Sequence, residues 1–279
     1  MKPPMISTVI SVLNGAGTLQ RCIESVACQT HANRELVVID GGSTDGTAQI
    51  LERNASALAY WVSEPDRGIY HAWNKGLARA RGDWIHFLGA DDYLPATDVY
   101  AQLMPILERA FPPVRIVYGR VLVECENGAV AQELGESWSR ARTRFTQVMP
   151  LPHTGVLHHR SLFESHGNFD ESFRIAGDYE MLLRELPEGE ALFVPELVVA
   201  MKRRGGVSTD PATAVRMMRE VRRAQVMHGG RRPGRLWLIA YAKARLRAGL
   251  WRLLGPRVAP YAFDFFRILG GKSRYWTLQ

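Results

Sequence analysis

The sequence predicts an α/β fold built on parallel strands, and three observations lead to this prediction. Apolar runs typical of buried strands alternate with segments of helical periodicity in the first 90 residues. Glycine-rich turns follow two of these runs, and a third run ends close to two adjacent carboxylates, Asp91 and Asp92. Strands that alternate with helices form parallel sheets, whose ligands bind outside the carboxyl ends of the strands.

The first two expected strands frame a parallel unit. Residues 6–13 (ISTVISVL) are rich in β-branched side chains, and Asn14 begins the turn that follows them. Apolar residues at helical spacing then predict a helix over residues 19–26. Residues 35–40 form the second strand, which ends at the glycine-rich turn of residues 41–47 before another helix. This order of strand, helix and strand indicates a right-handed crossover.

This unit has features of a nucleotide-binding fold but lacks two familiar motifs. Neither glycine-rich turn has the G-x-G-x-x-G spacing of a dinucleotide fold, and no G-x-x-x-x-G-K-[ST] sequence occurs. Asp40, at the tip of a strand, could accept a hydrogen bond from the N–H of a pyrimidine base. Asp45 is expected to fix its loop or to cap the next helix.

A third strand over residues 61–64 and a helix over residues 69–77 are expected next. Arg67 precedes this helix, and Asn74 and Lys75 flank its apolar face. A fixed cation near a diphosphate would help to bind it and would balance the charge of the leaving group. The alternative for Arg67 and Lys75 is a surface salt bridge, and for Lys75 this alternative is preferred.

The strand over residues 84–88 brings Asp91 and Asp92 to its tip. Because adjacent residues in extended chain point to opposite sides, we expect one carboxylate on a divalent metal and the other on a polar group of the ligand. Mn²⁺ or Mg²⁺ takes one or two protein carboxylates and completes its coordination with water and phosphate oxygens. A polar turn without a ligand is the alternative, since Asp is common in turns.

Taken together, the segments ISTVISVLN, ELVVIDGGSTDGT, SEPDRGIYHAWNKGL and GDWIHFLGADDYL resemble the family 2 glycosyltransferases, in particular members that build bacterial exopolysaccharide and lipopolysaccharide. The resemblance implies a GT-A fold, with a Rossmann-like mixed central sheet flanked by helices in residues 1–210. Residues 211–279 would form a basic, amphipathic helical extension.

The resemblance also implies roles for individual residues. A nucleotide pocket would involve Ser11, Asp40 and Arg67, with Asp91 near the ribose and Asp92 holding the metal, Mn²⁺ or Mg²⁺. Only the last two residues of Ala90-Asp91-Asp92 are acidic where the family often has D-x-D, which leaves their division of labour open. The residues that we expect to bind the nucleotide sugar are Ser11, Asn14, Asp40, Arg67, Asn74, Lys75 and Asp91.

Asp178 stands at the start of a segment with helical character, residues 178–183. It could simply cap that helix, but the resemblance places the catalytic base at this position. Residues 205–208 (Gly-Gly-Val-Ser) resemble a loop that closes over the donor. The three histidines of residues 153–159 lack ligand spacing, so we expect no zinc site, although His153 could contact the sugar or the metal.

The charge of the chain is unevenly distributed. From Arg216 onward there are fifteen Lys and Arg against two acids, a net charge of +13, whereas the first 215 residues carry −6. Basic residues interleaved with Trp and Leu suit a helix in an anionic membrane interface. Packing on the main domain with a solvated basic face is the alternative, and nucleic-acid binding is not expected.

Composition and cysteine usage indicate the compartment. The three cysteines have no metal-type spacing, which is typical of free thiols in a reducing compartment. No signal peptide and no bilayer-spanning segment is expected. We therefore expect a cytoplasmic protein that can associate with the inner face of the cell membrane.

These observations favour an inverting, metal-dependent hexosyltransferase. A sugar would pass from a nucleotide-diphosphate donor, with a UDP-sugar favoured, to the hydroxyl of a carbohydrate or lipid-linked saccharide acceptor, and Asp178 would take the proton. One alternative is a sugar-phosphate nucleotidyltransferase, although residues 14–18 lack the Arg and Lys of that class. The other is a non-catalytic protein of the same fold that docks on a membrane.

Overall fold

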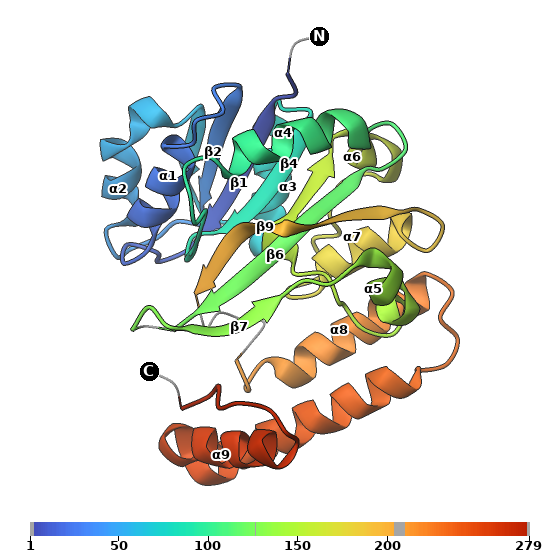
Figure 1. The fold of residues 1–279 in the computed structure, drawn as a ribbon. Helices are drawn as coiled ribbons and strands as arrows, with labels where there is room; N and C mark the ends of the chain where they lie inside the picture. The colour runs from blue at the N-terminus through green and yellow to red at the C-terminus, as the bar shows by residue number, and fades with distance from the viewer. Residues whose placement is uncertain (1–2, 126, 204–209, 278–279) are drawn as a thin grey trace.

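The computed structural model describes residues 3–125, 127–203 and 210–277, which form one mixed sheet with helices on both faces and a helical C-terminal part (Figure 1). The strands are β1 (Ile6–Val12), β2 (Arg34–Asp40), β3 (Tyr60–Ser63), β4 (Trp84–Gly89), β5 (Asp92–Tyr93), β6 (Ile116–Glu124), β7 (Val130–Leu134), β8 (Val156–His159) and β9 (Ala191–Arg203). The helices are α1 (Leu19–Ala27), α2 (Thr47–Arg53), α3 (Ile69–Arg79), α4 (Val99–Ala110), α5 (Trp138–Phe145), α6 (Ser161–His166), α7 (Gly177–Glu185), α8 (Ala214–Met227) and α9 (Arg235–Leu269), with the short 3-10 helices η1 (Ala55–Ala57) and η2 (His153–Gly155).

The strand order is β3-β2-β1-β4-β8-β6-β9-β5, with β7 on β6. β1 pairs in parallel with β2 and β4, and β3 pairs in parallel with β2, as the alternation of strands and helices predicts. β8 runs antiparallel to both β4 and β6, and this makes the sheet mixed. The predicted α/β fold with a mixed sheet and a helical C-terminal part is therefore confirmed.

Both faces of the sheet are buried because alternate strand residues enter two separate cores. Val9, Val37 and Ile39 lie in one core with α3, α7 and α8. Ile10 and Val38 lie in the other core with α1, α2 and α4. This two-sided burial explains why the parallel strands are almost uninterrupted apolar runs.

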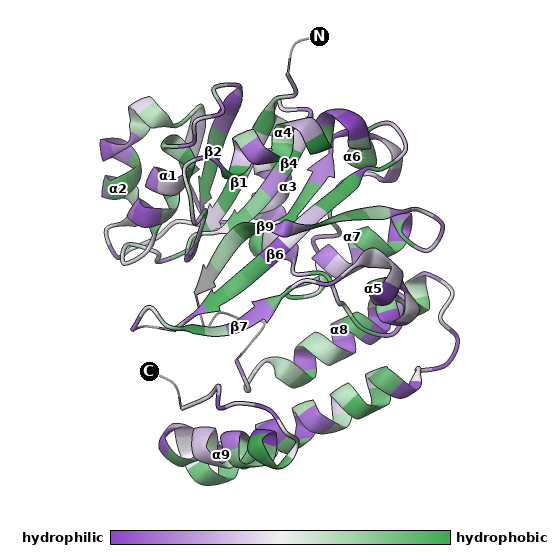
Figure 2. Cartoon of the chain, viewed as in Figure 1, coloured by the Kyte–Doolittle hydropathy of each residue, from purple (hydrophilic) through white to green (hydrophobic). Residues whose placement is uncertain are grey.

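The C-terminal helices differ in how they pack. α8 buries Met218, Val221 and Ala224 in the same core as α7, so it is an integral layer of the main domain. α9 packs against α8 but is kinked at Gly255, whose φ of +71° lies in the left-handed region. Figure 2 shows apolar and polar residues interspersed along α9. Among the described residues, no helix has the length and apolar character needed to span a bilayer.

Gly76 allows α3 to lie directly on the sheet. A Cβ at this position would stand 2.4 Å from Cγ1 of Val9 and 3.5 Å from Cγ1 of Ile39. The side chains of Val9 and Ile39 are both fully buried, and therefore neither has room to move away from the added Cβ.

We predict that Gly76→Ala lowers the free energy of unfolding by about 1–3 kcal/mol, because overpacking outweighs the gain in helix propensity. The matched control is Gly249→Ala in α9, where nothing lies within 4 Å of the added Cβ. That change should raise the stability by about 0.5–1 kcal/mol. Urea denaturation of both variants measures the two effects, and equal behaviour of the two glycines would contradict this account of α3 packing.

Candidate active site

The carboxyl ends of three parallel strands bring the expected donor-binding residues to one edge of the sheet. Ser11 of β1 stands between Ile39 of β2 and Gly89 of β4 in the strand register. Asp40 is paired with Val12, one position further along β1. Asp91 and Asp92 directly follow β4, so the sheet places Ser11, Asp40 and the acid pair at the same edge.

Asp40 is fully buried beneath the turn that follows β2. Its carboxylate accepts hydrogen bonds from the backbone N–H of Ser43 at 3.1 Å and from Oγ of Ser63 at 2.5 Å. Asn14 joins this turn to the one after β1, since its N–H donates to Oγ of Ser43 at 2.7 Å. In this structure Ser43 and Ser63 donate the hydrogen bonds to Asp40 that the sequence suggested would come from the N–H of a base.

Asp45 has the structural role that the sequence favoured. Its carboxylate accepts hydrogen bonds from N–H and Oγ1 of Thr47, at 3.1 and 2.5 Å, and from the N–H of Ala16 at 3.0 Å. These bonds, together with those of Asn14, connect the turns after β1 and β2 into one rigid unit.

Asp91 and Asp92 converge above Gly89. A Cβ built on Gly89 would lie 2.8 Å from Oδ1 of Asp91 and 3.0 Å from Oδ2 of Asp92. The expectation that the two carboxylates point to opposite sides is therefore wrong, because residues 90–91 form a turn and are not extended chain. The thiol of Cys22 lies close by, and burial, followed by the charges of Asp92 and Asp91, raises its pKa well above the ordinary value.

This arrangement fits a Mn²⁺ or Mg²⁺ ion. The described residues contain no group of three or more His, Cys, Asp or Glu that could hold a metal by themselves. Two convergent carboxylates beside a glycine are nevertheless what these ions use when a diphosphate and water supply the remaining oxygens.

Thr154 orients Asp92 and was not identified from the sequence. Its hydroxyl donates to Oδ2 of Asp92 at 3.0 Å, and the N–H of Gly89 donates to the same oxygen at 3.3 Å. The carbonyl of Thr154 accepts a hydrogen bond from Nε2 of His86 at 2.7 Å. Burial lowers the pKa of His86 to about 4, so its imidazole is neutral and Nδ1 accepts from the hydroxyl of Tyr100 at 2.9 Å.

Asp178 lies in the first turn of α7, half-buried against Tyr70 of α3. Its Oδ1 accepts the N–H of Tyr179 at 2.8 Å and the hydroxyl of Tyr70 at 3.3 Å. Burial, followed by the charge of Asp178, raises the pKa of Tyr70 well above the ordinary value, so this hydroxyl stays a donor. The N-cap of α7 is Ala176, and Asp178 is therefore not a simple capping residue.

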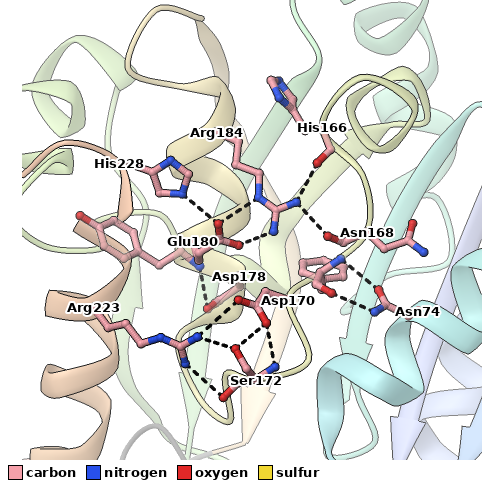
Figure 3. A network of polar contacts seen from close by, with 12 residues as sticks. Asn74, His166, Asn168, Asp170, Ser172, Asp178, Glu180, Arg184, Arg223 and His228 are labelled. Atoms are coloured by element: carbon pink, nitrogen blue, oxygen red, sulfur yellow. Dashed lines mark hydrogen bonds and ion pairs between the residues drawn. The ribbon is translucent and has the colours of Figure 1, made fainter. Parts of the chain in front are cut away.

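The loop before Asp178 is held from both sides. Glu220 of α8 accepts the backbone N–H groups of residues 174, 175 and 176 on a single oxygen, at 3.0, 2.8 and 3.1 Å. Asn74 exchanges two hydrogen bonds with the backbone of Phe169, at 2.9 and 3.0 Å (Figure 3). It also donates to Glu171 at 3.1 Å. In this structure Asn74 holds the loop, and its expected contact with the donor stays a prediction.

The two expected cations of this region are both paired with carboxylates. Arg67 bonds to Glu171 and Lys75 pairs with Glu64 at 2.8 Å. Both pairs match the salt-bridge alternative that the sequence left open. A diphosphate would have to compete with these carboxylates for either side chain.

A second polar network is centred on Glu180 and Arg184 of α7, close to Asp178 (Figure 3). Glu180 is buried and pairs with Arg184 and, at 2.8 Å, with His228 at the end of α8. Arg184 also donates to the carbonyls of His166 and Asn168, both at 2.8 Å. This network fixes α7 against α8 and the 166–168 loop, and so it supports the position of Asp178.

Aromatic side chains connect the acid pair to Asp178. Tyr70 contacts Trp73 with ring centroids 5.4 Å apart, and Trp73 stacks on His153 at 5.0 Å. His153 adjoins Thr154, the partner of Asp92. On the other side, a Cβ on Gly41, next to Asp40, would stand 2.6 Å from the carboxylate of Asp66.

Side-chain contacts thus connect Asp92 to Asp178. Asp40 lies at the same edge of the sheet as Asp92. The loop of residues 205–208, which resembles a donor-closing loop, lies outside the described residues.

Comparison with known proteins identifies the family. A family model described as "Glycosyl transferase family 2" matches residues 7–166. A "PGL/p-HBAD biosynthesis glycosyltransferase" of Mycobacterium bovis is 33% identical over 187 residues, which cover 66% of this chain and 70% of that protein. An uncharacterized glycosyltransferase of Rickettsia typhi is 24% identical over 215 residues, covering 75% of this chain and 67% of the relative.

Solved structures share the fold. A mannosyltransferase of Pyrobaculum calidifontis, in complex with GDP-Man and Mn²⁺, has a TM-score of 0.61 at 22% identity, over 94% of this chain and 75% of that one. Residues 1–349 of S. aureus TarS, in complex with UDP-GlcNAc, have a TM-score of 0.61 at 16% identity, over 79% of this chain. The matched region spans 66% of that fragment and 39% of a longer TarS structure.

At these identities the structures confirm the expected GT-A type of fold, and the family model covers more than half of the sequence. The chain belongs to glycosyl transferase family 2 and is a glycosyltransferase.

Proposed function

We propose that this glycosyltransferase is metal-dependent and inverting, and that it moves a hexose from a nucleotide-diphosphate sugar, with a UDP-sugar favoured, to an acceptor hydroxyl. The observation that carries the proposal has two parts. Asp40 and the convergent Asp91 and Asp92 lie at one edge of the sheet, and side-chain contacts connect this edge to Asp178. The name of the mycobacterial relative supports a role in glycolipid or cell-surface glycan assembly.

Asp178 is the proposed general base. Its carboxylate takes the proton of the acceptor hydroxyl while the hydroxyl oxygen attacks the anomeric carbon from the face opposite the nucleotide. The bond from that carbon to the acceptor oxygen forms as the bond to the diphosphate oxygen breaks, so the configuration inverts and no covalent intermediate is needed. The hydrogen bonds from Tyr70 and Tyr179 fix the orientation of the carboxylate.

Asp92 is the proposed metal ligand, with Asp91 beside it toward the ribose. A bound Mn²⁺ or Mg²⁺ would supply positive charge to the diphosphate as it leaves. Thr154 holds the Asp92 carboxylate in place through its hydroxyl, at 3.0 Å. The Mn²⁺ and GDP-Man in the archaeal mannosyltransferase support this assignment.

Donor binding is assigned to the edge of the sheet. We propose that Ser11, Asn14 and Asp40 hold the nucleotide. Asp40 would give up the hydrogen bond from one serine and accept one from the N–H of the base. Arg67 and Lys75 are proposed to turn from Glu171 and Glu64 to the diphosphate, a change that the exposed position of Arg67 allows.

The C-terminal extension is proposed to bind an anionic membrane surface peripherally. After the kink of α9, one helical face is exposed, with Tyr261, Phe265 and Leu269 at spacings of four residues and exposures of 68, 59 and 69%. Apolar side chains on one face of a basic helix suit insertion at the level of lipid headgroups.

A transfer assay tests the proposed function. Purified protein with Mn²⁺, a nucleotide sugar and an acceptor should release nucleoside diphosphate, and the product should have the opposite anomeric configuration by NMR. Retention of configuration would contradict the inverting mechanism. Release of pyrophosphate from a nucleoside triphosphate and a sugar phosphate would identify a nucleotidyltransferase, and binding of donor without turnover would indicate a non-catalytic protein.

We predict that Asp178→Asn lowers kcat by about 10²–10⁴-fold, because the amide cannot accept the acceptor proton. Donor binding and Tm should not change, since the amide oxygen can still accept the bonds from Tyr70 and Tyr179. Steady-state kinetics and a donor titration measure the two quantities. A full transfer rate in this variant would remove Asp178 from the role of base.

We predict that Asp92→Asn abolishes the Mn²⁺-dependent part of nucleotide binding. In the unmodified protein, ligand at about 100 times its Kd should add about 2.7 kcal/mol of stability, and this gain should need Mn²⁺. The matched control is Asp98→Asn, an exposed acid before α4 that should leave the gain intact. Thermal melts with UDP, recorded with and without Mn²⁺, measure this gain in stability. If Mn²⁺ still increased the gain in Asp92→Asn, the assignment of Asp92 as metal ligand would be refuted.

We predict that Glu220 is a positioning residue for Asp178. Glu220→Ala leaves three backbone N–H groups without their acceptor, and it should destabilise the fold by about 3 kcal/mol and lower kcat with little effect on the donor KM. Glu220→Gln retains an acceptor oxygen and should recover most of kcat. Arg216→Ala, which removes only the exposed ion pair of Glu220, should cost about 0.5 kcal/mol or less. A Glu220→Ala enzyme with normal kcat would contradict this role.

A further inference from the structure

A pocket of about 650 Å³ lies between α8, the two arms of α9 and the C-terminal segment. Its volume falls within the range of roughly 300–1,000 Å³ that is common for small-molecule sites. Apolar side chains from all of these elements line it, including Met218 of α8, Leu250 and Phe263 of α9, and Trp276. The pocket is separate from the residues assigned to the donor and to the base.

Two features build this pocket. The first is the kink at Gly255, which bends α9 so that Leu250 and Phe263 face a common space. The second is Asp264, a buried carboxylate that accepts the backbone N–H groups of Tyr275, Trp276 and Thr277 at 2.8 to 2.9 Å. Asp264 thereby fixes the C-terminal segment as a wall of the pocket.

The same pocket is lined by four cations, Lys243, Arg247, Arg267 and Lys272. The only acids of the sequence from residue 216 onward are Glu220 and Asp264, and both are committed elsewhere, to residues 174–176 and to residues 275–277. Within the described part of the chain, no carboxylate forms an ion pair with any of the four cations. Burial, followed by the charge of Arg267, lowers the pKa of Arg247, so the two guanidinium groups lie close enough to repel each other.

An apolar pocket whose cations form no ion pair with any described carboxylate is complementary to one chemical class. A ligand with a phosphate and a hydrocarbon chain would place its charge on the cations and its chain against Met218, Leu250 and Phe263. An inorganic phosphate would leave the apolar walls in water, and a neutral lipid would leave the cations without an anion.

The sheet register connects this pocket to the proposed metal site. Gln132 of β7 lines the pocket and is paired with Val123 of β6. Val123 is paired with residue 202 of β9, which is paired with Asp92 of β5. Gln132 and Asp92 therefore stand in one row across four adjacent strands, a backbone separation of about 14 Å at the usual strand spacing.

We propose that this pocket binds one anionic lipid, a phosphate attached to a hydrocarbon chain, which carries the acceptor of the sugar. The phosphate lies on Lys243 and Arg247, and the first part of the chain occupies the apolar walls. The binding stands by itself, whereas the role of the lipid as acceptor carrier rests on the proposed function.

Lysophosphatidic acid, used below its micelle concentration, is the probe for this site. Calorimetric titration of the full chain should give saturable binding that is stronger for a long-chain probe than for a short-chain one. Lysophosphatidylcholine and inorganic phosphate should each bind at least about tenfold more weakly, because each satisfies only part of the site. Equal binding of the zwitterionic lipid, or saturation by phosphate alone, would overturn the proposal.

A matched pair of double variants locates the binding. Lys243→Gln with Arg247→Gln removes two cations of the pocket, whereas Arg252→Gln with Arg257→Gln removes two exposed cations of α9 that do not line it. The first pair should weaken binding of the probe at least about tenfold and the second should have little effect. An equal loss in both would indicate general charge attraction and would overturn the proposal. Unchanged Tm values exclude unfolding, and Leu250→Asp provides a second test of the apolar wall.

The outcome for the pocket can be separated from the outcome for the enzyme. Probe binding needs no nucleotide sugar, and transfer to a water-soluble acceptor needs no lipid. Loss of lipid binding with intact transfer would defeat only the inference about the pocket. Lipid binding without transfer of any sugar would defeat the proposed function and leave the pocket as a lipid site.

Discussion

The parallel pairing of β1 with both β2 and β4 is the constraint on which the site depends. It fixes Ser11 beside Ile39 and Gly89, so three chain segments leave the sheet at the same level. A register shift of one residue would turn the side chains of each strand to the opposite core, and the close packing of the two different cores opposes this change. The edge where Asp40 and the acid pair lie is therefore set by hydrophobic burial far from any ligand.

Most of the first half of the fold could be predicted from the sequence because its signals are local. Apolar runs, helical periodicity and glycine turns identify β1, β2, β4 and α3, and Asp45 binds the turn residues that its position suggests. What the local pattern could not show was which acid or cation meets which partner. Arg67 and Asn74 stay predicted donor ligands, but the local pattern could not show that Glu171, about a hundred residues later, bonds to both side chains.

The residues that were not identified from the sequence also have partners that lie far away along the chain. Thr154 acts on Asp92 across 62 residues, Tyr70 on Asp178 across 108, and Glu220 on the 174–176 loop across about 45. Nothing in the neighbouring sequence distinguishes Thr154 or Tyr70 from ordinary residues of a turn or a helix. Glu220 was the one usable signal, because it is the only acid of the basic helix α8 and an acid that becomes buried needs a set of donors.

The position of Glu220 changes how the C-terminal part should be understood. Because α8 supplies the acceptor for the loop before Asp178, this helix helps to position the proposed base, although its sequence looks like an appended basic segment. Glu220 is one of the two acids that the sequence has from residue 216 onward, and Asp264, whose carboxylate binds residues 275–277, is the other. Both carboxylates thus serve backbone N–H groups, and within the described residues neither forms an ion pair that neutralises the positive charge of the four pocket cations. An anionic lipid beside the exposed face of α9 would meet that charge where Gln132 brings the pocket into line with Asp92.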